Sequence, residues 1–353
     1  MKKKVVFPGT VRIGRDLKIY KKTGNSWKEQ NPDDFNGLEN TFLVINLFKK
    51  NRNFNKLIDK KNPKFLKGQR SPEGKCQGAR INILPDGREL DGAYSLFARH
   101  LTIHDQKSHF HWDVIYQNPN GAFAYHYTLE KKKKAKNKKF NQVKEFEKIY
   151  PTLEKNVFNA LENKKDYMAL PIYTLLKTYI RVGNEIYFRL HNHKGLTTLK
   201  KQDVKIDGIS VNFSFIGKNG VPQSISRNFP ERYIKKLKER LNKIKKQDFI
   251  FKTPRGRVLH EEDFKKAFKK YCGKSFYPHI VRSFFATKQT EDFLRKNKNP
   301  NKKQTREFLF YVAEELGHKK YSKKNEQWEE SYSVTIGYYI APRLVEKLRK
   351  NLK

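Results

Sequence analysis

The chain has 353 residues, and its 77 lysines and arginines against 36 aspartates and glutamates give a formal net charge of +41. Its 13% aromatic content excludes a disordered basic tail, because such tails lack the aromatic residues that build a core. Two cysteines are too few for a disulfide framework or a four-thiolate zinc site, and no apolar run approaches the roughly 18 residues of a membrane span. We therefore expect a soluble, intracellular, two-domain protein whose self-repulsion a polyanion relieves, with nucleic acid as the leading partner.

The first 128 residues are rich in turn signals and predict a small β-rich domain. Pro85-Asp86-Gly87 and Asn118-Pro119-Asn120-Gly121 separate short apolar runs, which we interpret as strands over 41–48 and 122–127. Residues 131–139 are mostly lysine and cannot bury a face. They predict a solvated basic linker over 129–139, or a strap that contacts phosphates.

From residue 140 the pattern becomes that of a mainly helical domain, which we extend over 140–353. Phe140, Val143 and Phe146 recur at helical spacing, and residues 169–187 form a more apolar helical stretch. Residues 203–229 alternate as strands, with Gly217–Gly220 as the turn of a hairpin. Further helices are predicted over 231–246, 261–271, 280–296, 304–316 and 342–352.

Short motifs follow one another along this second domain. They are Arg181-Val182-Gly183-Asn184-Glu185, Gly195-Leu196-Thr197-Thr198-Leu199, Gly217-Lys218-Asn219-Gly220, His279-Ile280-Val281-Arg282, Leu316-Gly317-His318 and Tyr338-Tyr339-Ile340-Ala341-Pro342. In this order they closely resemble the motifs of type IB DNA topoisomerases of the poxvirus and bacterial kind, from roughly residue 125 to the C-terminus. Any one motif is weak, but six in the family's order are highly specific.

The resemblance implies an α+β fold. A small β-rich N-terminal domain over 1–128 would join a mainly α catalytic domain of the tyrosine recombinase and topoisomerase IB type, which carries a β-hairpin sheet. The family's second motif is a strand, and its first motif lies on a helix. The N-terminal 120 residues match the family only in size and β character, apart from the element Gly121…Tyr125-x-Tyr127.

The residue types in these motifs suit an exchange of phosphoryl esters. A tyrosine can replace a DNA hydroxyl at phosphorus and later be displaced, because its phenolate leaves more easily than an alkoxide. Two arginines can stabilise the charge that develops on the non-bridging oxygens, since a guanidinium stays charged and binds phosphate in a bidentate manner. The resemblance assigns Tyr339 as the nucleophile and Arg181 and Arg282 as the phosphate clamps.

The departing 5′-oxygen needs a proton, and a lysine on a mobile hairpin can supply it. By resemblance this general acid is Lys218, and His318 is a hydrogen-bond donor to the phosphate. His279 occupies a position where these topoisomerases usually have lysine and related tyrosine recombinases often have histidine. We treat it as a second candidate for proton transfer.

The chain departs from the family between His318 and the nucleophile. Residues 319–333 form a charged insertion of about a dozen residues that contains Trp328. Tyr321, Tyr332 and Tyr338 all lie near this insertion, so the nucleophile could be one of them. Tyr339 is favoured because Tyr-Ile-Ala-Pro and the apolar helix that follows match the family's ending, and Tyr338 is next.

A histidine cluster in the first domain invites a metal interpretation. His100, His104, His109, His111 and Asp113 carry common ligand types, and the alternation from 109 to 113 puts three of them on one strand face. A wet strand that faces DNA is the favoured interpretation, because aromatic and basic residues mix over the same region. We expect no metal and no other cofactor. The expected DNA-binding residues are Tyr125, Tyr127, Lys131, Lys132, Lys133, Lys134, Thr197 and Thr198.

These observations predict a monomeric clamp around duplex DNA that relaxes supercoils through transient single-strand cleavage, without ATP or metal. Two alternatives stay open at this point: a tyrosine recombinase, which shares the chemistry, and a non-catalytic DNA-packaging protein, to which the net charge alone would point. The Lys- and Asn-rich composition suggests a bacterial or viral source, with the protein in cytoplasm, nucleoid or virion, and residues 131–139 could also direct it to a nucleus.

Overall fold

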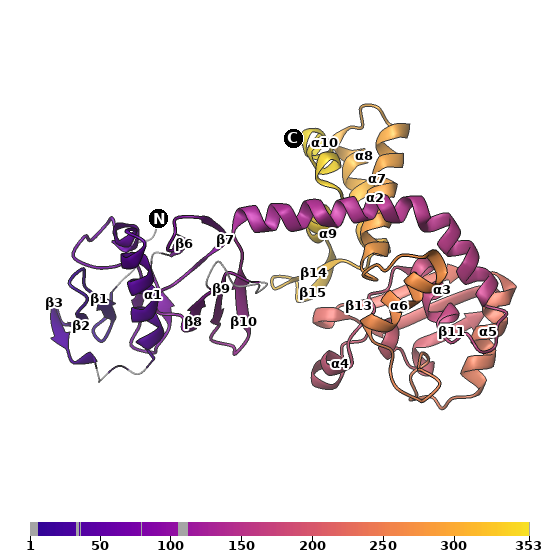
Figure 1. Ribbon diagram of the computed structural model, residues 1–353, viewed down its shortest axis with the longest axis horizontal. Coiled ribbons are helices and arrows are strands. Elements are labelled where there is room, and N and C mark those ends of the chain that lie inside the picture. The colour runs from indigo at the N-terminus through magenta and orange to yellow at the C-terminus, as the bar shows by residue number, and fades with distance from the viewer. Residues whose placement is uncertain (1–5, 33–34, 36, 79, 105–111, 353) are drawn as a thin grey trace. The chain divides into compact units, whose positions relative to one another are not determined.

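The structure is a computed structural model that describes residues 6–32, 35, 37–78, 80–104 and 112–352. The chain divides into two compact units, residues 1–137 and 138–353. Figure 1 shows short strands and helix α1 in the first unit and mainly helices in the second. No helix in the described ranges is both long enough and apolar enough to cross a lipid bilayer.

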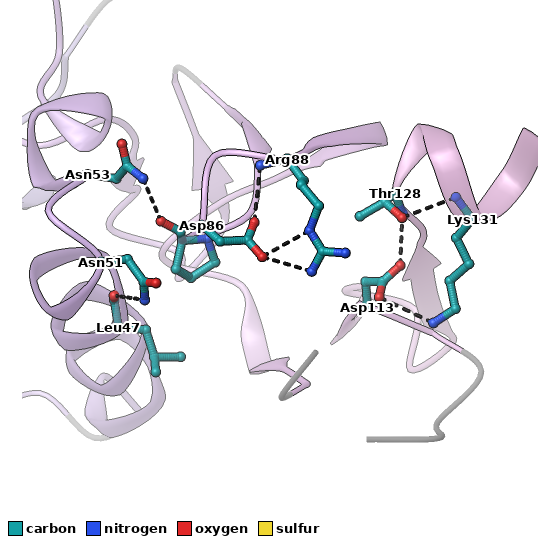
Figure 2. A network of polar contacts seen from close by, with 9 residues as sticks. Leu47, Asn51, Asn53, Asp86, Arg88, Asp113, Thr128 and Lys131 are labelled. Carbon is teal, nitrogen blue, oxygen red and sulfur yellow. Dashed lines mark hydrogen bonds and ion pairs between the residues drawn. The ribbon is translucent and has the colours of Figure 1, made fainter. Parts of the chain in front are cut away.

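Antiparallel sheets build the first unit. Strand order is β3-β2-β1-β4-β5 in a five-stranded sheet and β10-β9-β8 in a three-stranded one, and β6 pairs with β7. Between β6 and β7 the expected Pro-Asp-Gly turn forms, and Figure 2 shows the Asp86 carboxylate accepting hydrogen bonds from the backbone and guanidinium of Arg88. The strand bounds are β1 Val11–Ile13, β2 Ile19–Thr23, β3 Ser26–Gln30, β4 Gln69–Arg70, β5 Cys76–Gln77, β6 Ile81–Ile83, β7 Glu89–Tyr94, β8 Arg99–Ile103, β9 Val114–Gln117 and β10 Phe123–His126.

The strand expected over 122–127 is confirmed as β10, but the one expected over 41–48 is wrong. That run lies in helix α1 (Glu39–Lys50), followed by the 3-10 helix η2 (Phe54–Leu57). Its buried residues are Thr41, Val44, Ile45 and Phe48. Their spacing of three, one and three places them on one helical face, which packs into the core of this unit.

The basic run is helical rather than an irregular linker. Helix α2 spans Leu129–Ala160 and therefore includes residues 129–139. Lysine is a good helix former, and the helix continues into the stripe of Phe140, Val143 and Phe146, which are buried as expected. Figure 2 shows how the helix starts: the Thr128 hydroxyl accepts from the Lys131 backbone N–H, and Asp113 accepts from the Thr128 N–H and the Lys131 ammonium.

The second unit surrounds a single large apolar cluster with helices and a small antiparallel sheet of order β11-β12-β13. The strands and all five of the later predicted helices are confirmed, with ends that shift by a few residues, and so is the α+β class. The helix expected over 169–187 is interrupted after Thr178. The bounds are α3 Ala169–Thr178, α4 Glu185–His191, β11 Val204–Asp207, β12 Ser210–Ile216, β13 Pro222–Asn228, α5 Glu231–Asn242, α6 Glu261–Cys272, α7 Ile280–Lys296, α8 Lys302–Glu315, β14 Lys319–Ser322, β15 Gln327–Glu330, α9 Ser333–Tyr338 and α10 Pro342–Leu352.

Candidate active site

Tyr339 lies just after α9, with 3% of its surface exposed, and its hydroxyl group is held between two basic side chains. The Oη atom accepts a hydrogen bond from Arg181 Nη2 at 3.3 Å and lies 3.1 Å from His279 Nε2. The guanidinium of Arg282 is 5.2 Å from the centre of the ring. The side chains of Arg181, His279 and Arg282 therefore converge on the phenol of Tyr339.

The competing tyrosines are in different surroundings. Tyr338 is 60% exposed, and Tyr321 is 46% exposed. Tyr332 is half-buried and packs edge-on against Phe310. Among the tyrosines near the insertion, Tyr339 is the one whose hydroxyl bonds to the cationic residues of the motifs.

Arg181 is presented by an irregular segment and not by the helix that the resemblance implied. Helix α3 ends where Tyr179 takes a left-handed φ of 56°, and α4 begins only after Asn184, whose side chain accepts from the N–H of Ile186. The backbone of this segment is fixed by hydrogen bonds from residues 196 and 197. The carbonyl of Arg181 accepts from Leu196 N at 2.8 Å, which holds the arginine in its place.

Two glycines allow that close approach. A Cβ built on Gly195 would lie 2.5 Å from Gly183 Cα, and Gly183 itself has a φ of +89°. A side chain at position 195 would push the two backbone segments apart. This is the reason for the glycines in both motifs.

Thr197 and Thr198, which were expected to bind DNA, direct their side chains to the backbone of the segment that carries Arg181. Both are fully buried in the 3-10 helix η3 (Leu196–Thr198), so the expected strand is also wrong. The Thr197 hydroxyl donates to the carbonyl of Val182, and the Thr198 hydroxyl bonds to Gly195. Both therefore act by holding the segment that carries Arg181.

Arg282 lies in the first turn of α7 and is 2% exposed. Its guanidinium donates to the carbonyls of Tyr179 and Leu316, the latter at 2.7 Å, and to His318 Nε2 at 3.0 Å. Its Nε is buried and has no partner among the described residues. Burial lowers the pKa of Arg282 to about 10, so the group is still charged at neutral pH.

His318 accepts hydrogen bonds from both arginines. Its Nε2 lies 3.0 Å from Arg282 Nη2 and 3.4 Å from Arg181 Nη2. A guanidinium can only donate, so Nε2 carries no proton and Nδ1–H donates to the Thr335 hydroxyl at 2.8 Å. Burial and the charges of the two arginines lower the pKa of His318 to about 2, so the ring is neutral.

His279 stands at the start of α7, in front of the Tyr339 hydroxyl. Desolvation and the charges of Arg282, Lys139 and Arg181 lower the pKa of His279, although the residue is solvent-exposed and water screens part of this effect. Since Arg181 donates to the phenol oxygen, the phenol proton is free to point at the neutral His279 Nε2. The imidazole is thus placed to take that proton.

Lys218 occupies the turn between β12 and β13, the expected hairpin. Asn219 and Gly220 have left-handed φ values of 64° and 79° there. The lysine is exposed and lines an open cavity of about 700 Å³ together with Arg181, His279 and Arg282. The structure therefore brings together all six residues expected to carry the chemistry.

The cluster attracts anions. Neither Arg181 nor Arg282 forms an ion pair with a carboxylate in the described part of the chain. Partly or fully buried cations without a counter-charge are costly unless a ligand supplies one. A phosphate would supply that charge and accept several of the hydrogen bonds that the arginines now make to carbonyl groups and to His318.

Comparison with known proteins agrees with this geometry. Residues 128–337 match the family described as the catalytic core of eukaryotic DNA topoisomerase I, which is more than half of the chain. The chain belongs to this topoisomerase I family. DNA topoisomerase 1B of Acanthamoeba polyphaga mimivirus is 29% identical over 111 residues, which cover 30% of this chain and 33% of that protein. The chain thus spans about a third of the length of the curated relative it matches.

Two solved structures also resemble the chain. The site-specific recombinase XerH in a post-cleavage complex with palindromic difH substrate shares 17% identity over 56% of this chain and 50% of that chain, with a TM-score of 0.36. The XerA recombinase shares 18% identity over 56% of this chain and 60% of that chain, with a TM-score of 0.34.

Lys139 is a site residue of this topoisomerase I family member that the sequence analysis assigned to the linker. Its Nζ lies 5.2 Å from the centre of the Tyr339 ring and donates to the Tyr338 carbonyl at 2.6 Å. A signal existed: position 139 is in phase with the buried Val143 and Phe146 of α2. A lysine on the apolar face of a helix indicates a specific partner.

The expected DNA-binding residues of the first unit lie on β10, directly after it and at the start of α2. Tyr125 is 48% exposed, and Tyr127 is half-buried. The lysines differ: Lys131 pairs with Asp113, Lys132 with Asp91 and Lys134 with Glu130, whereas Lys133 is exposed and has no ion pair within the described residues.

The histidine cluster is seen only in part. His109 and His111 lie outside the described residues. Asp113 is 4% exposed and is used to hold the start of α2. Within the described ranges, no three His, Cys, Asp or Glu side chains gather as a metal ion would require.

Proposed function

We propose that this chain relaxes supercoiled duplex DNA as a type IB topoisomerase. It would cleave one strand through a covalent 3′-phosphotyrosyl intermediate at Tyr339, allow rotation, and reseal the strand. The observation that carries the proposal is the contact of one buried phenol with Arg181 and His279, beside Arg282. Family membership supports the same reaction.

Cleavage exchanges one phosphodiester for another. The phenol oxygen attacks phosphorus, the P–O5′ bond breaks, and the phenol proton passes to His279 Nε2. Lys218 gives a proton to the departing 5′-oxygen, which leaves as a hydroxyl group. Resealing runs the same steps backwards, so neither ATP nor a metal is needed.

Arg181 and Arg282 would bind the non-bridging oxygens in the transition state. His318 then changes partner. Once a phosphate takes the arginine donors, His318 can carry its proton on Nε2 and donate to the same phosphate, because the Thr335 hydroxyl at Nδ1 can donate as well as accept. The resemblance implies this donor role, and the contacts with Thr335 support it.

A denaturing gel with end-labelled duplex tests the proposal. Wild type should form a covalent protein–DNA adduct and relax a supercoiled plasmid, with EDTA present and ATP absent. Tyr339→Phe should lose both activities, because it removes the nucleophilic oxygen and keeps the ring. Tyr338→Phe is the matched control and should keep both.

Each of the following results would overturn one part of the proposal. An adduct that persists in Tyr339→Phe transfers the nucleophile to another tyrosine. Binding without any adduct from wild type favours a packaging protein. Synapsis of two duplexes with strand exchange favours a recombinase. The expected partner is duplex DNA bound by a monomer, which sedimentation of the complex can measure.

A further inference from the structure

The insertion between His318 and Tyr339 forms a two-stranded hairpin, β14 and β15, that projects from the second unit (Figure 1). Lys319 and Lys320 of β14 face Glu330 and Glu329 of β15 across the strand pair. Opposite charges in register compensate each other. The hairpin is therefore poorly suited to act as a simple basic strap for DNA.

Trp328 of this hairpin lies beside the turn that carries Lys218, across a space that one added methyl group would fill. A Cβ built on Gly220 would lie 3.9 Å from Trp328 Cζ2 and 3.8 Å from His193 Nε2. The Tyr321 ring backs the indole edge-on, with centroids 5.4 Å apart. The tip of the turn thus lies beside an aromatic pair that the insertion supplies.

The base of the same turn is tied to the His318 corner. Gln223 of β13 donates from Nε2 to the Gly317 carbonyl at 3.1 Å. The Lys218 side chain, in contrast, makes no hydrogen bond or ion pair within the described residues. The direction of its ammonium group therefore depends on the turn, and Trp328 and His193 lie beside the tip of that turn.

We propose that the β14–β15 hairpin is a positioning element for the general acid. Trp328 holds the turn 217–220 so that Lys218 Nζ faces the departing 5′-oxygen. This inference rests on the proposed function, in which Lys218 transfers its proton to that oxygen as the P–O5′ bond breaks. Trp328 itself touches no reacting atom.

A DNA substrate with sulfur in place of the bridging 5′-oxygen tests whether Trp328 acts by positioning the general acid or in another way. A thiol has a pKa of about 8.5 and leaves as a thiolate, so this substrate needs no proton from Lys218. Single-turnover cleavage is measured on two labelled duplexes, one with oxygen and one with sulfur at the site mapped with wild type. The variants are Lys218→Ala, Trp328→Ala and Trp328→Phe, with Gln327→Ala as the matched control on the same strand.

On the oxygen substrate, we expect Lys218→Ala to lose about 10²–10⁴-fold and Trp328→Ala about tenfold, because a misdirected acid keeps part of its effect. On the sulfur substrate both should cleave close to the wild-type rate. Trp328→Phe should retain more activity than Trp328→Ala, and Gln327→Ala should match wild type on both duplexes.

A Trp328→Ala variant that is slowed equally on both duplexes, or on neither, overturns the inference. If the sulfur substrate does not restore cleavage by Lys218→Ala, Lys218 is not the general acid, and the inference about Trp328 is refuted with it. The covalent adduct of wild type would still support topoisomerase chemistry. Absence of that adduct would instead refute the proposed function.

Discussion

Lys139 adds a further cation beside the phenol of Tyr339, and its contribution can be separated from the attraction of a basic chain for DNA. A positive charge 5.2 Å from the ring stabilises the phenolate that attacks phosphorus. Lys139→Met keeps most of the apolar stem and removes the charge. We expect single-turnover cleavage at saturating protein to fall about tenfold, less than the about 10²–10³ expected for a donor to the oxyanion.

The neighbouring Lys138 provides the control. It is exposed on the same turn of α2, so Lys138→Met removes an equal charge away from the phenol. This variant should bind DNA slightly less tightly and cleave at the wild-type rate once saturated. Equal losses of cleavage in both variants would show that Lys139 acts only through DNA affinity.

His318 makes the free energy of unfolding depend on pH. Its pKa is lowered to about 2 in the folded protein, against an ordinary value of about 6.5. Between these values the unfolded chain binds a proton that the folded chain does not, so stability is lost as pH falls below about 6.5. Urea titrations of the full chain should show a loss of about 2 kcal/mol from this group between pH 7 and pH 5.

His318→Gln should flatten this dependence by the same amount, whatever it does to stability at pH 7. A wild-type slope that survives in His318→Gln would mean that the ring is not held neutral by its surroundings.

At the level of residues, much of the candidate site can be recognised from the sequence because its chemistry resides in short motifs. Arg181, His279, Arg282 and Tyr339 could be named because their neighbours along the chain match the family's motifs, and the structure brings their side chains together. Lys139 was missed because it reaches the phenol from a helix far away in sequence, and its helical phase with Val143 and Phe146 marks it only as a lysine on an apolar face. A motif marks the importance of a residue without telling whether its side chain faces a ligand or the backbone, and the Thr197 hydroxyl donates to the backbone carbonyl of Val182.

At the scale of elements, the predictions that rest on hydrophobic periodicity agree with the structure. The helix over 280–296 and the strands of 203–229 follow their patterns closely. The run 41–48 was assigned from nearby turn signals, although its buried positions have helical spacing. Segment 129–139 was predicted to be a linker from its charge alone. A high charge indicates that a segment is solvated, but it does not indicate that its backbone is irregular.

The strand expected over 195–199 was wrong for a different reason. The family resemblance implied a strand, which the β-branched residues also suit, but the crossing of Gly183 and Gly195 forces a 3-10 turn. That contact joins parts of the chain that no local pattern connects. Tertiary packing therefore overrides propensity at the point where Arg181 must be held.

At the scale of the whole molecule, a net charge of +41 should govern affinity for DNA through release of counterions. For about six to ten neutralised phosphates, the affinity of Tyr339→Phe for a labelled duplex should fall by about 10³–10⁵ between 50 and 200 mM salt. The nucleophile variant keeps the binding reversible, and fluorescence anisotropy measures it. Relaxation by wild type should become distributive over the same range.

Substitution of single lysines in the first unit can locate the residues that make DNA affinity depend on salt. Lys133 is exposed without an ion pair in the described residues, whereas Lys132 already pairs with Asp91 at 3.0 Å. If α2 lies along the phosphates, Lys133→Gln should reduce the slope of log affinity against log salt by about one. Lys132→Gln should change it less, because its charge is partly compensated before DNA arrives. Affinity that does not vary with salt would contradict an electrostatic clamp, and equal slopes in both variants would remove α2 from the interface.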